Sequence, residues 1–415
     1  MINSNPIKIC VVEPRGKGGM IHYAYQLCSG FADNGAEVTL ITSTTYELDE
    51  LPHNFKVEKK MRLWDTMNTN LPAQTFLGRL IQKAYKFIRR GFRGFRYITE
   101  WYRMVRFLPK LRPDFTLFGK IEFPFEAIFL RHLKRKGLVL GDICHEFERR
   151  ELSRSFIENW YNKQYNDAFE NFSTLFFHAN NNLERFQELF DNSPEKLKII
   201  DHGNENIFIE FAKLSNQPAN LRAKYTLQED AQIVLFFGLL SPSKGIPELI
   251  DAFAKVVKKY PKGKLVIAGY PSKYVDPQEY KNQVENLELQ NNIIFDFRYI
   301  PNEVIGELMG LATVVVYPYT SSTQSGALQV AYSFGRPVIV TDVGGLPEVV
   351  EHGKSGLIVP PHSSNELASA ISSFIEDPKM AETMGTYAKH LSDTRFSWKT
   401  ITAQIIMDIQ PGITP

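Results

Sequence analysis

The chain has 415 residues, and its 48 Lys and Arg nearly balance 46 Asp and Glu, giving a formal net charge of +2. This balance argues against nucleic acid as a partner of the whole surface, although local basic patches remain open. A hydrophobic content of 43% is ordinary for a globular protein. The length exceeds one ordinary core and predicts about two domains.

The cysteines and the apolar runs bear on the compartment. Cys10, Cys28 and Cys144 are isolated within apolar segments, which predicts buried thiols in a reducing compartment rather than metal ligands or disulfides. The first residues contain no apolar signal core, and no run reaches the roughly 18 residues that span a bilayer. We therefore expect a cytoplasmic protein.

The first half of the chain opens like a parallel α/β sheet. A β-rich run at 7–12 is followed by a glycine loop, a helix over 20–35 that stops at Gly35, and a second strand at 36–42. Later strands of the same sheet are predicted at 138–144, 174–179 and 197–203.

The second half repeats this pattern after a polar interval from about 204 to 230. Its predicted strands lie at 232–238, 264–269, 292–300, 313–319, 337–345 and 355–361, with a helix at 246–261. Two successive units of this kind predict two doubly wound sheets. Ligands in such sheets bind beyond the carboxyl ends of the strands, and the crevice between domains is the natural site.

The loop from Arg15 to Gly19 follows the first strand and opens the first helix. Gly18 and Gly19 would let the backbone approach an anion at a helix N-terminus. The spacing is neither the dinucleotide GxGxxG pattern nor a P-loop. By itself the loop is compatible with an anion cradle or with a tight turn.

Two loops of the second half raise the same question. Lys244, in the turn Ser-Pro-Ser-Lys-Gly after a strand, is placed to neutralise a phosphate, but it also fits a solvated turn. Ser325 and Gly326 open the helix of ALQVAYSFG, where they form either an anion cradle or a helix cap. A further glycine pair at a strand end precedes Glu348, which alone would be an ordinary first-turn residue.

His145 directly follows the apolar run 138–144. A histidine at the carboxyl end of a strand can polarise a substrate hydroxyl or accept a hydrogen bond from it. Ungrouped histidines are more often structural. His178 and His202, also near a strand end, are lesser candidates.

The pattern resembles a family 4 glycosyltransferase, a retaining enzyme that uses a nucleotide sugar and has the GT-B fold. The resemblance is carried by EPRGKGG, by FFGLLSPSKG, by the long run from YPYTSSTQSG to SGLIVPP, and by the closing FSWKTITAQIIMDI. It implies two Rossmann-like domains facing a central cleft, an acceptor-side domain at 1–205 and a nucleotide-sugar domain at 206–395. Residues 396–415 would form a helix that packs back on the first domain.

The resemblance also implies roles for particular residues. Lys244 and His145 take the catalytic positions, with Lys244 at the diphosphate and His145 at the donor sugar. The residues expected to bind the donor are Gly18, Gly19, Gly269, Gln324, Ser325, Gly326, Gly344, Gly345 and Glu348. No metal and no cofactor are expected, because amide dipoles and a lysine would stabilise the departing diphosphate.

Three positions depart from the family pattern. Ser322 and Val330 stand where the family has a pair of glutamates, and Leu239 stands where it has an arginine before the lysine turn. An amide such as that of Gln324 or Gln329 is a weaker partner for a ribose diol than a carboxylate. These departures leave open remodelled donor contacts, reduced affinity, or lost catalysis.

A basic and aromatic stretch at 79–112 supplies a separate clue, since eleven Lys and Arg residues stand against Glu100 alone. It suits the headgroup layer of an anionic membrane or a polyanionic acceptor, but also RNA, or a solvated helix whose aromatic residues enter the core. The residues expected to contact membrane or acceptor are Arg89, Arg90, Arg93, Arg96 and Trp101.

These observations favour a glycosyltransferase that moves a hexosyl group from a nucleoside-diphosphate-sugar to a glycan or lipid-linked acceptor, in cell-surface polysaccharide or glycolipid synthesis. Its location would be cytoplasmic, peripheral at the inner membrane face, and no nucleic acid is expected as a partner. The alternative is a catalytically weak or inactive GT-B protein that acts as a binding or accessory subunit. A nucleic-acid-binding protein has only the basic stretch in its favour.

Overall fold

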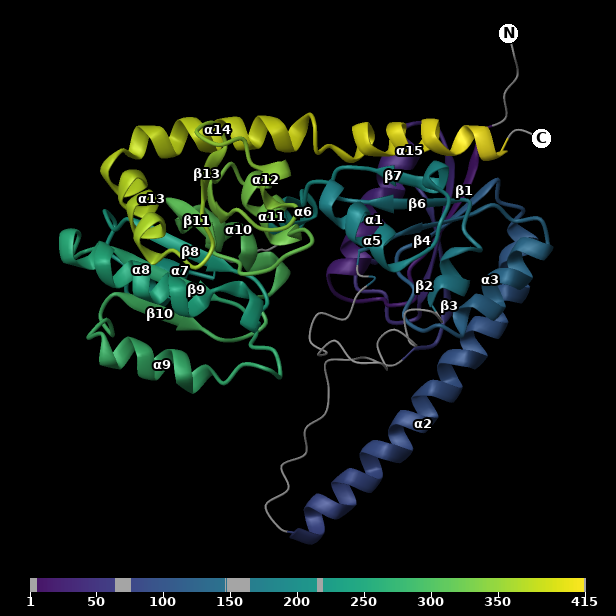
Figure 1. The fold of residues 1–415 in the computed structure, drawn as a ribbon, viewed down its shortest axis with the longest axis horizontal. Helices are drawn as coiled ribbons and strands as arrows, with labels where there is room; N and C mark the ends of the chain where they lie inside the picture. The colour runs from purple at the N-terminus through teal and green to yellow at the C-terminus, as the bar shows by residue number, and fades with distance from the viewer. Residues whose placement is uncertain (1–5, 64–75, 146, 148–164, 215–218, 414–415) are drawn as a thin grey trace. The chain divides into compact units, whose positions relative to one another are not determined.

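The computed structural model describes residues 6–63, 76–145, 147, 165–214 and 219–413. The chain divides into two compact units, each with one parallel sheet (Figure 1). Unit 1 comprises Met1–Phe177, Leu183–Ile200 and Thr402–Pro415, and unit 2 comprises His178–Asn182 and Asp201–Ile401.

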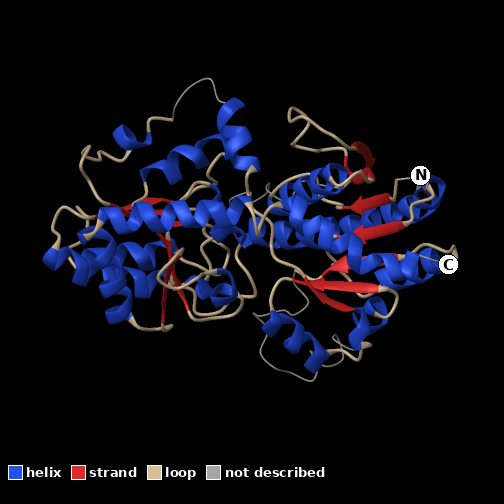
Figure 2. Cartoon of the chain, turned by 90° about the horizontal axis from the view of Figure 1, so that it is seen from above, coloured by secondary structure: helices blue, strands red, loops and turns tan. Residues whose placement is uncertain are grey.

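Unit 1 contains a seven-stranded sheet in the order β3-β2-β1-β4-β5-β6-β7. Its strands are β1 (Lys8–Val12), β2 (Glu37–Ser43), β3 (Lys56–Met61), β4 (Phe115–Phe118), β5 (Leu140–Ile143), β6 (Thr174–Phe177) and β7 (Leu197–Ile199). All neighbouring strands pair in parallel, and Val11 of β1 is in register with Leu40 of β2 and Leu117 of β4. Helices cover the sheet on both faces, as Figure 2 shows, which explains the nearly unbroken apolar runs of the inner strands.

The helices of unit 1 differ in how far they are buried. They are α1 (Gly19–Asp33), α2 (Phe76–Phe107), α3 (Glu126–Arg135) and α5 (Asn180–Leu189), with 3₁₀ turns η1 (Leu108–Leu111) and η2 (Pro194–Lys196). The first residues of α5, up to Asn182, belong to unit 2. The long helix α2 runs away from the strands of its unit at its N-terminal end (Figure 1). Its other end is fixed by Trp101, whose ring stacks at 5.8 Å on Phe118 and at 5.6 Å on Phe129.

Unit 2 contains a six-stranded parallel sheet in the order β10-β9-β8-β11-β12-β13. Its strands are β8 (Ile233–Phe237), β9 (Lys264–Ala268), β10 (Ile293–Asp296), β11 (Val314–Tyr317), β12 (Val338–Thr341) and β13 (Gly356–Val359). Its helices are α6 (Ile207–Leu214), α7 (Leu221–Lys224), η3 (Pro242–Lys244), α8 (Ile246–Lys259), α9 (Pro277–Asn286), α10 (Asn302–Leu311), α11 (Gly326–Ser333), α12 (Leu346–Val349), α13 (Ser364–Glu376) and α14 (Pro378–Asp393). The two parallel α/β sheets predicted from the sequence are confirmed.

The last helix, α15 (Trp398–Ile413), begins in unit 2 and belongs to unit 1 from Thr402 onward. In unit 2 the Trp398 indole Nε1 donates a hydrogen bond of 2.8 Å to the carbonyl of Asn204. In unit 1 the Asn34 side-chain amide donates one of 2.9 Å to Thr402 Oγ1. The C-terminal helix expected from the sequence is therefore present.

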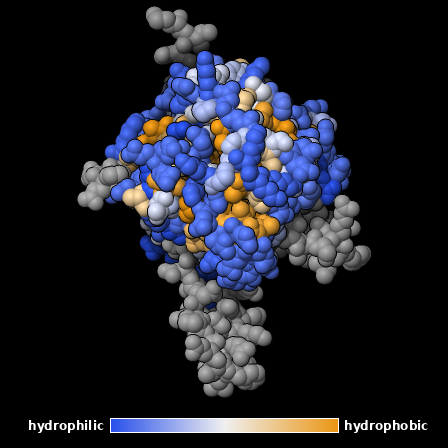
Figure 3. All heavy atoms as spheres, turned by 90° about the vertical axis from the view of Figure 1, so that its left-hand side faces the viewer, coloured by the Kyte–Doolittle hydropathy of each residue, from blue (hydrophilic) through white to orange (hydrophobic). Residues whose placement is uncertain are grey.

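The face seen in Figure 3 is largely hydrophilic, with small hydrophobic areas separated by polar side chains. Among the described residues, no helix combines the length and the apolar character needed to cross a bilayer.

Candidate functional site

In unit 2 the loops that follow β8 and β11 lie against each other. Gly245, which ends the turn η3, has a φ of 65°, and a Cβ there would lie 1.8 Å from the carbonyl oxygen of Pro318. The amide of Thr320 donates a hydrogen bond of 2.9 Å to the carbonyl of Ser243. Only glycine fits at position 245, and its presence lets the lysine turn approach the strand end of β11.

This approach brings Lys244 and Ser325 to one tyrosine. The Lys244 ammonium lies 3.5 Å from the centroid of the Tyr319 ring, a distance typical of a cation–π interaction. The Tyr319 hydroxyl lies 3.2 Å from Ser325 Oγ. Ser325 in turn caps α11, since its Oγ accepts a hydrogen bond of 3.3 Å from the amide of Leu328. Ser325 and Gly326 are therefore a capped helix start, and a lysine lies close to it.

The glycine pair after β12 packs on the same loop. Gly344 has a φ of 57°, and a Cβ there would lie 1.7 Å from the Ser322 carbonyl oxygen. The Gly345 amide donates a hydrogen bond of 3.1 Å to the Thr323 carbonyl, which also accepts one of 3.1 Å from the Asn182 side chain. The predicted donor positions 324–326 and 344–345 are thus brought together.

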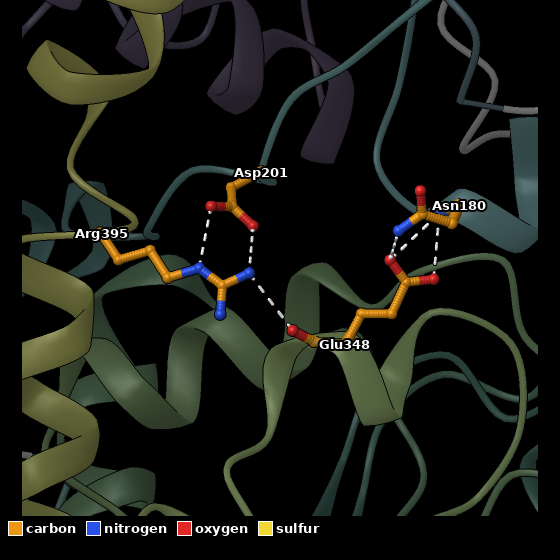
Figure 4. A network of polar contacts seen from close by, with 4 residues as sticks. All are labelled: Asn180, Asp201, Glu348 and Arg395. Carbon is orange, nitrogen blue, oxygen red and sulfur yellow. Dashed lines mark hydrogen bonds and ion pairs between the residues drawn. The ribbon is translucent and has the colours of Figure 1, made fainter.

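Glu348 lies in a polar network of unit 2 that Figure 4 shows. Its carboxylate accepts hydrogen bonds from the Asn180 amide at 3.0 Å and from the Asn180 side chain at 2.8 Å. Its carbonyl accepts one of 3.2 Å from Arg395, whose guanidinium also forms an ion pair with Asp201 at 2.7 Å. The network fixes the first turn of α12, and the side chain of Glu348 remains partly exposed.

A buried histidine lies beside the start of α11. A Cβ at Gly326 would lie 3.6 Å from His202 Cε1 and 3.7 Å from Glu205 Oε1. The His178 and His202 rings are 5.0 Å apart. Burial lowers the pKa of His202 to about 4, although the hydrogen bond with the Gly203 carbonyl favours the protonated ring. At neutral pH the imidazole is therefore uncharged.

The other residues of unit 2 that the sequence analysis named are Gly269, Gln324, Val330 and Leu239. Gly269 has a φ of 152°, and a Cβ there would lie 1.8 Å from the Gly238 carbonyl oxygen. Gln324 is partly buried, and its Oε1 has no hydrogen-bond partner among the described residues. Val330 is buried, whereas Leu239 is 56% exposed.

In unit 1 the N-terminus of α1 is already occupied by a carboxylate of the chain. Glu47 Oε1 accepts hydrogen bonds from the Gly18 amide at 2.7 Å and from His22 Nε2 at 2.8 Å. Burial pushes the pKa of Glu47 upward, but the hydrogen bonds from His22 and Gly18 outweigh it and hold that pKa below its usual range. An anion at this glycine loop would have to compete with Glu47 for the Gly18 amide.

Two fully buried carboxyl groups lie at the strand ends of the same sheet. Glu13, after β1, accepts a hydrogen bond of 2.9 Å from the Arg15 amide, and burial raises its pKa to about 7. Asp142, on β5, lies 3.5 Å from Cys144 Sγ, and burial raises its pKa to about 7 as well. The Arg15 guanidinium meets Glu122 at 2.5 Å. Glu13, Asp142 and Glu122 thus place carboxyl groups after or near the ends of three strands of this sheet.

His145 lies just beyond β5 in unit 1 and is buried, with 6% of its surface exposed. Its ring meets the ring of Tyr23, from α1, edge to face at a centroid distance of 4.5 Å. This contact orients the imidazole beside the helix that Gly18 and Gly19 open. Among the described residues, no three His, Cys, Asp or Glu side chains converge as metal ligands.

Helix α2 places the residues of the basic stretch on different sides, some exposed and some buried. Arg89, Arg93 and Arg96 are partly exposed on α2, and the side chain of Arg90 lies outside the described residues. Trp101 is 1% exposed in the core of unit 1, so its assignment to a membrane or acceptor surface is wrong. The indole faces the sheet because position 101 is on the packed side of the helix.

Sequence reasoning missed Tyr319, Asn180 and Glu47. Their roles depend on loops that meet only in the fold, and Glu47 is 29 residues from Gly18. The only local signal was the aromatic residue in YPYT directly before the polar loop.

Comparison with known proteins finds relatives over about half of the chain. Residues 218–391 match the family model described as Glycosyl transferases group 1. A D-inositol 3-phosphate glycosyltransferase from Corynebacterium glutamicum is 30% identical over 235 residues, which are 55% of each protein. The chain thus matches about half the length of this curated relative.

Solved structures resemble the whole chain. Anabaena Alr3699/HepE, solved in complex with UDP and glucose, has a TM-score of 0.68 at 21% identity and covers 98% of this chain and 100% of its own. A sucrose-phosphate synthase from Thermosynechococcus elongatus also has a TM-score of 0.68 at 21% identity, covering 97% of this chain and 98% of its own. With the two parallel sheets and the C-terminal helix, this likeness confirms the GT-B fold.

Proposed function

We propose that this protein is a retaining glycosyltransferase that transfers a hexosyl group from a nucleoside-diphosphate-sugar to a glycan or lipid-linked acceptor. The observation that carries the proposal is the group formed by Lys244, Tyr319 and Ser325 at the strand ends of unit 2. This group lies within the segment that matches Glycosyl transferases group 1. The work of the enzyme would be cell-surface polysaccharide or glycolipid synthesis.

The departing diphosphate develops negative charge, so the transfer requires positive charge at the position of the leaving group. The bond between the sugar carbon and the diphosphate oxygen breaks, and its electron pair stays on the diphosphate. An acceptor hydroxyl oxygen bonds to the same carbon, and its proton passes to the departing diphosphate or to water. Lys244 and the amides at the start of α11 would stabilise that charge without a metal or a cofactor. Tyr319 holds the lysine near the helix start through its ring and its hydroxyl.

His145 would orient the donor sugar, and no protein nucleophile is assigned. Gly18, Gly19, Gly269, Gln324, Gly344, Gly345 and Glu348 remain the proposed donor contacts. HepE was solved in complex with UDP and glucose, which supports a nucleotide sugar as the donor of this chain. The base would pack near Gly269 and Tyr270, the latter 59% exposed.

The proposed location is the cytoplasm, peripheral at the inner face of the membrane, where a lipid-linked acceptor is found. Arg89, Arg93 and Arg96 on α2 support this location, since they are exposed in part and only one acidic residue shares the helix. No nucleic acid partner is proposed.

A titration with a panel of UDP- and GDP-sugars, followed by thermal shift and by release of the nucleoside diphosphate, tests the proposal. We expect at least one donor to raise the melting temperature and to be turned over slowly even without acceptor. No binding at millimolar ligand would overturn it. Binding without any release would favour the accessory subunit, which is supported by three departures from the family pattern at Ser322, Val330 and Leu239.

A further inference from the structure

The exposed side of α2 carries large apolar side chains in a continuous stripe. Phe92, Phe95, Ile98 and Tyr102 are 64%, 67%, 45% and 50% exposed. Their spacing of three, three and four residues places them on one side of the helix. We call these four residues the α2 aromatic face.

The opposite side of the same helix holds it to unit 1. Tyr97, Trp101, Met104 and Val105 are all buried in the core cluster of that unit. The Tyr97 hydroxyl donates a hydrogen bond of 2.8 Å to the buried carboxyl of Glu126. The side of α2 that packs on unit 1 is therefore already buried, and the exposed stripe is a separate side of the helix.

Positive charge flanks the α2 aromatic face. Arg106 lies beside the face, with its guanidinium carbon 4.2 Å from the centroid of the Tyr102 ring, and Arg96 lies four residues from Phe92, about one helical turn along α2. Glu100 is the one acidic residue in the helix sequence; it is buried and paired with Arg103 at 2.7 Å. Glu100 thus balances the charge of Arg103, and Arg96 and Arg106 supply the positive charge beside the α2 aromatic face.

We propose that the α2 aromatic face docks onto the headgroup layer of an anionic lipid bilayer. Aromatic side chains enter the interface while arginines bind lipid phosphates, so the helix lies along the membrane surface. Charge complementarity favours an anionic bilayer over a second copy of this chain, whose own face would repel it. The inference deepens the proposed function, since a lipid-linked acceptor would be met at that surface.

Vesicle co-sedimentation of the full chain without any donor tests the proposal. The protein should sediment with mixed phosphatidylcholine–phosphatidylglycerol vesicles and remain unbound with phosphatidylcholine alone. Raising the salt from about 0.1 to about 0.5 M should weaken binding severalfold through screening. Binding that is absent, or equal on both vesicles, would overturn the proposal.

Two pairs of variants locate the surface. The double substitution Phe92→Ser with Phe95→Ser should lower the partition coefficient about tenfold or more, because it removes apolar area from the interface. Leu214→Ser with Tyr274→Ser is the matched control, since these side chains are 47% and 51% exposed in unit 2. Equal losses in both variants would contradict the assignment.

The charge is tested in the same way. Arg96→Gln with Arg106→Gln should weaken binding to anionic vesicles several-fold, whereas Lys258→Gln with Lys281→Gln, the same loss of charge on exposed positions of unit 2, should not. If light scattering finds a dimer that the Phe92→Ser, Phe95→Ser variant dissociates, while vesicles do not bind, the face is an interface between copies and the membrane proposal falls. Donor titrations are independent of all these outcomes, so the two proposals fail separately.

Discussion

The glycine loops of the two units look alike in sequence but have opposite charge environments. In unit 2 a lysine lies beside the start of α11, over the ring of Tyr319. In unit 1 the start of α1 binds the carboxylate of Glu47, and Glu13 is buried next to the same loop. A helix N-terminus attracts anions in both cases, but at the loop of unit 1 an outside anion would have to compete with Glu47 for the Gly18 amide.

This difference shows that glycines in a loop indicate a close approach of the backbone to another segment, but do not indicate the charge of a ligand. Gly245 and Gly344 are needed because carbonyl oxygens lie within 1.8 Å and 1.7 Å of where a Cβ would be. Such packing is required whether or not a phosphate binds. The charged residues that the fold brings to each loop decide what it holds.

The largest effect is expected for Lys244→Ala. Loss of the ammonium should lower the transfer rate about 100- to 1000-fold, as removal of one group that stabilises developing charge does in other enzymes. Lys258→Ala, on the exposed outer side of α8, is the matched control and should retain the rate. Steady-state assays of the release of the nucleoside diphosphate give the measurement, and a loss below about threefold would remove Lys244 from the reaction.

Buried carboxyl groups should make unit 1 less stable as the pH rises. The pKa of Glu13 is raised from 4.5 to about 7 by burial, so its contribution is complete below pH 4.5 and lost as the pH passes 7. At about 1.4 kcal/mol per pKa unit the loss is about 3 kcal/mol. The free energy of unfolding, measured by urea titration at several pH values, should depend less on pH between 4.5 and 7 in Glu13→Gln than in wild type. The same pH dependence in both proteins would contradict this.

The opposite dependence is expected in unit 2. Burial lowers the pKa of His202 from 6.5 to about 4, so its contribution is complete above pH 6.5 and lost as the pH falls toward 4. The loss of unfolding free energy is again about 3 kcal/mol. His202→Gln should remove this acid-side loss in the same unfolding series, and a retained loss would assign it to another group.

Glu47→Ala tests whether the loop of unit 1 is held by its own carboxylate. Removing the acceptor of Gly18 and His22 should lower the free energy of unfolding by about 1–3 kcal/mol. Glu47→Gln, which keeps an oxygen acceptor, should lose less. Phosphate should stabilise the Glu47→Ala protein more than wild type in a thermal shift, and equal shifts would show that the loop binds no outside anion even when vacated.

The smallest effect is expected for the helix cap of the unit 2 loop. Ser325→Ala removes the acceptor of the Leu328 amide and should cost about 1 kcal/mol of stability. Ser363→Ala is the control, because Ser363 precedes α13 without a side-chain cap bond, and it should be nearly neutral in thermal melts. Equal losses in both variants would show that the Ser325 hydroxyl does not cap α11.

Sequence patterns predicted most of the fold. The strand runs and their glycine turns led to the two parallel sheets because buried parallel strands are nearly continuous in apolar residues. Strands β3 and β4 were missed. The β3 sequence KVEKKM is charged because it lies at a sheet edge, and the four residues FTLF of β4 are too few for periodicity to decide.

The site was predictable only in part. Lys244 and Ser325 were visible because turn and cap residues are local signals. Tyr319, Asn180 and Glu47 were not, since the partners that define their roles, such as Lys244, Glu348 and Gly18, lie on separate loops and helices that meet only in the fold. Trp101 was misassigned because a helix with aromatic residues on both sides does not reveal in sequence which side meets the sheet.

The most direct test of the central claim compares UDP with uridine, or GDP with guanosine, by calorimetric titration of the wild type and Lys244→Ala. If the lysine beside α11 binds the diphosphate, the substitution should weaken the binding of the nucleoside diphosphate about tenfold or more. The affinity for the nucleoside should remain nearly unchanged. Equal losses for the two ligands, or no loss for either, would contradict the assignment of the diphosphate site to unit 2.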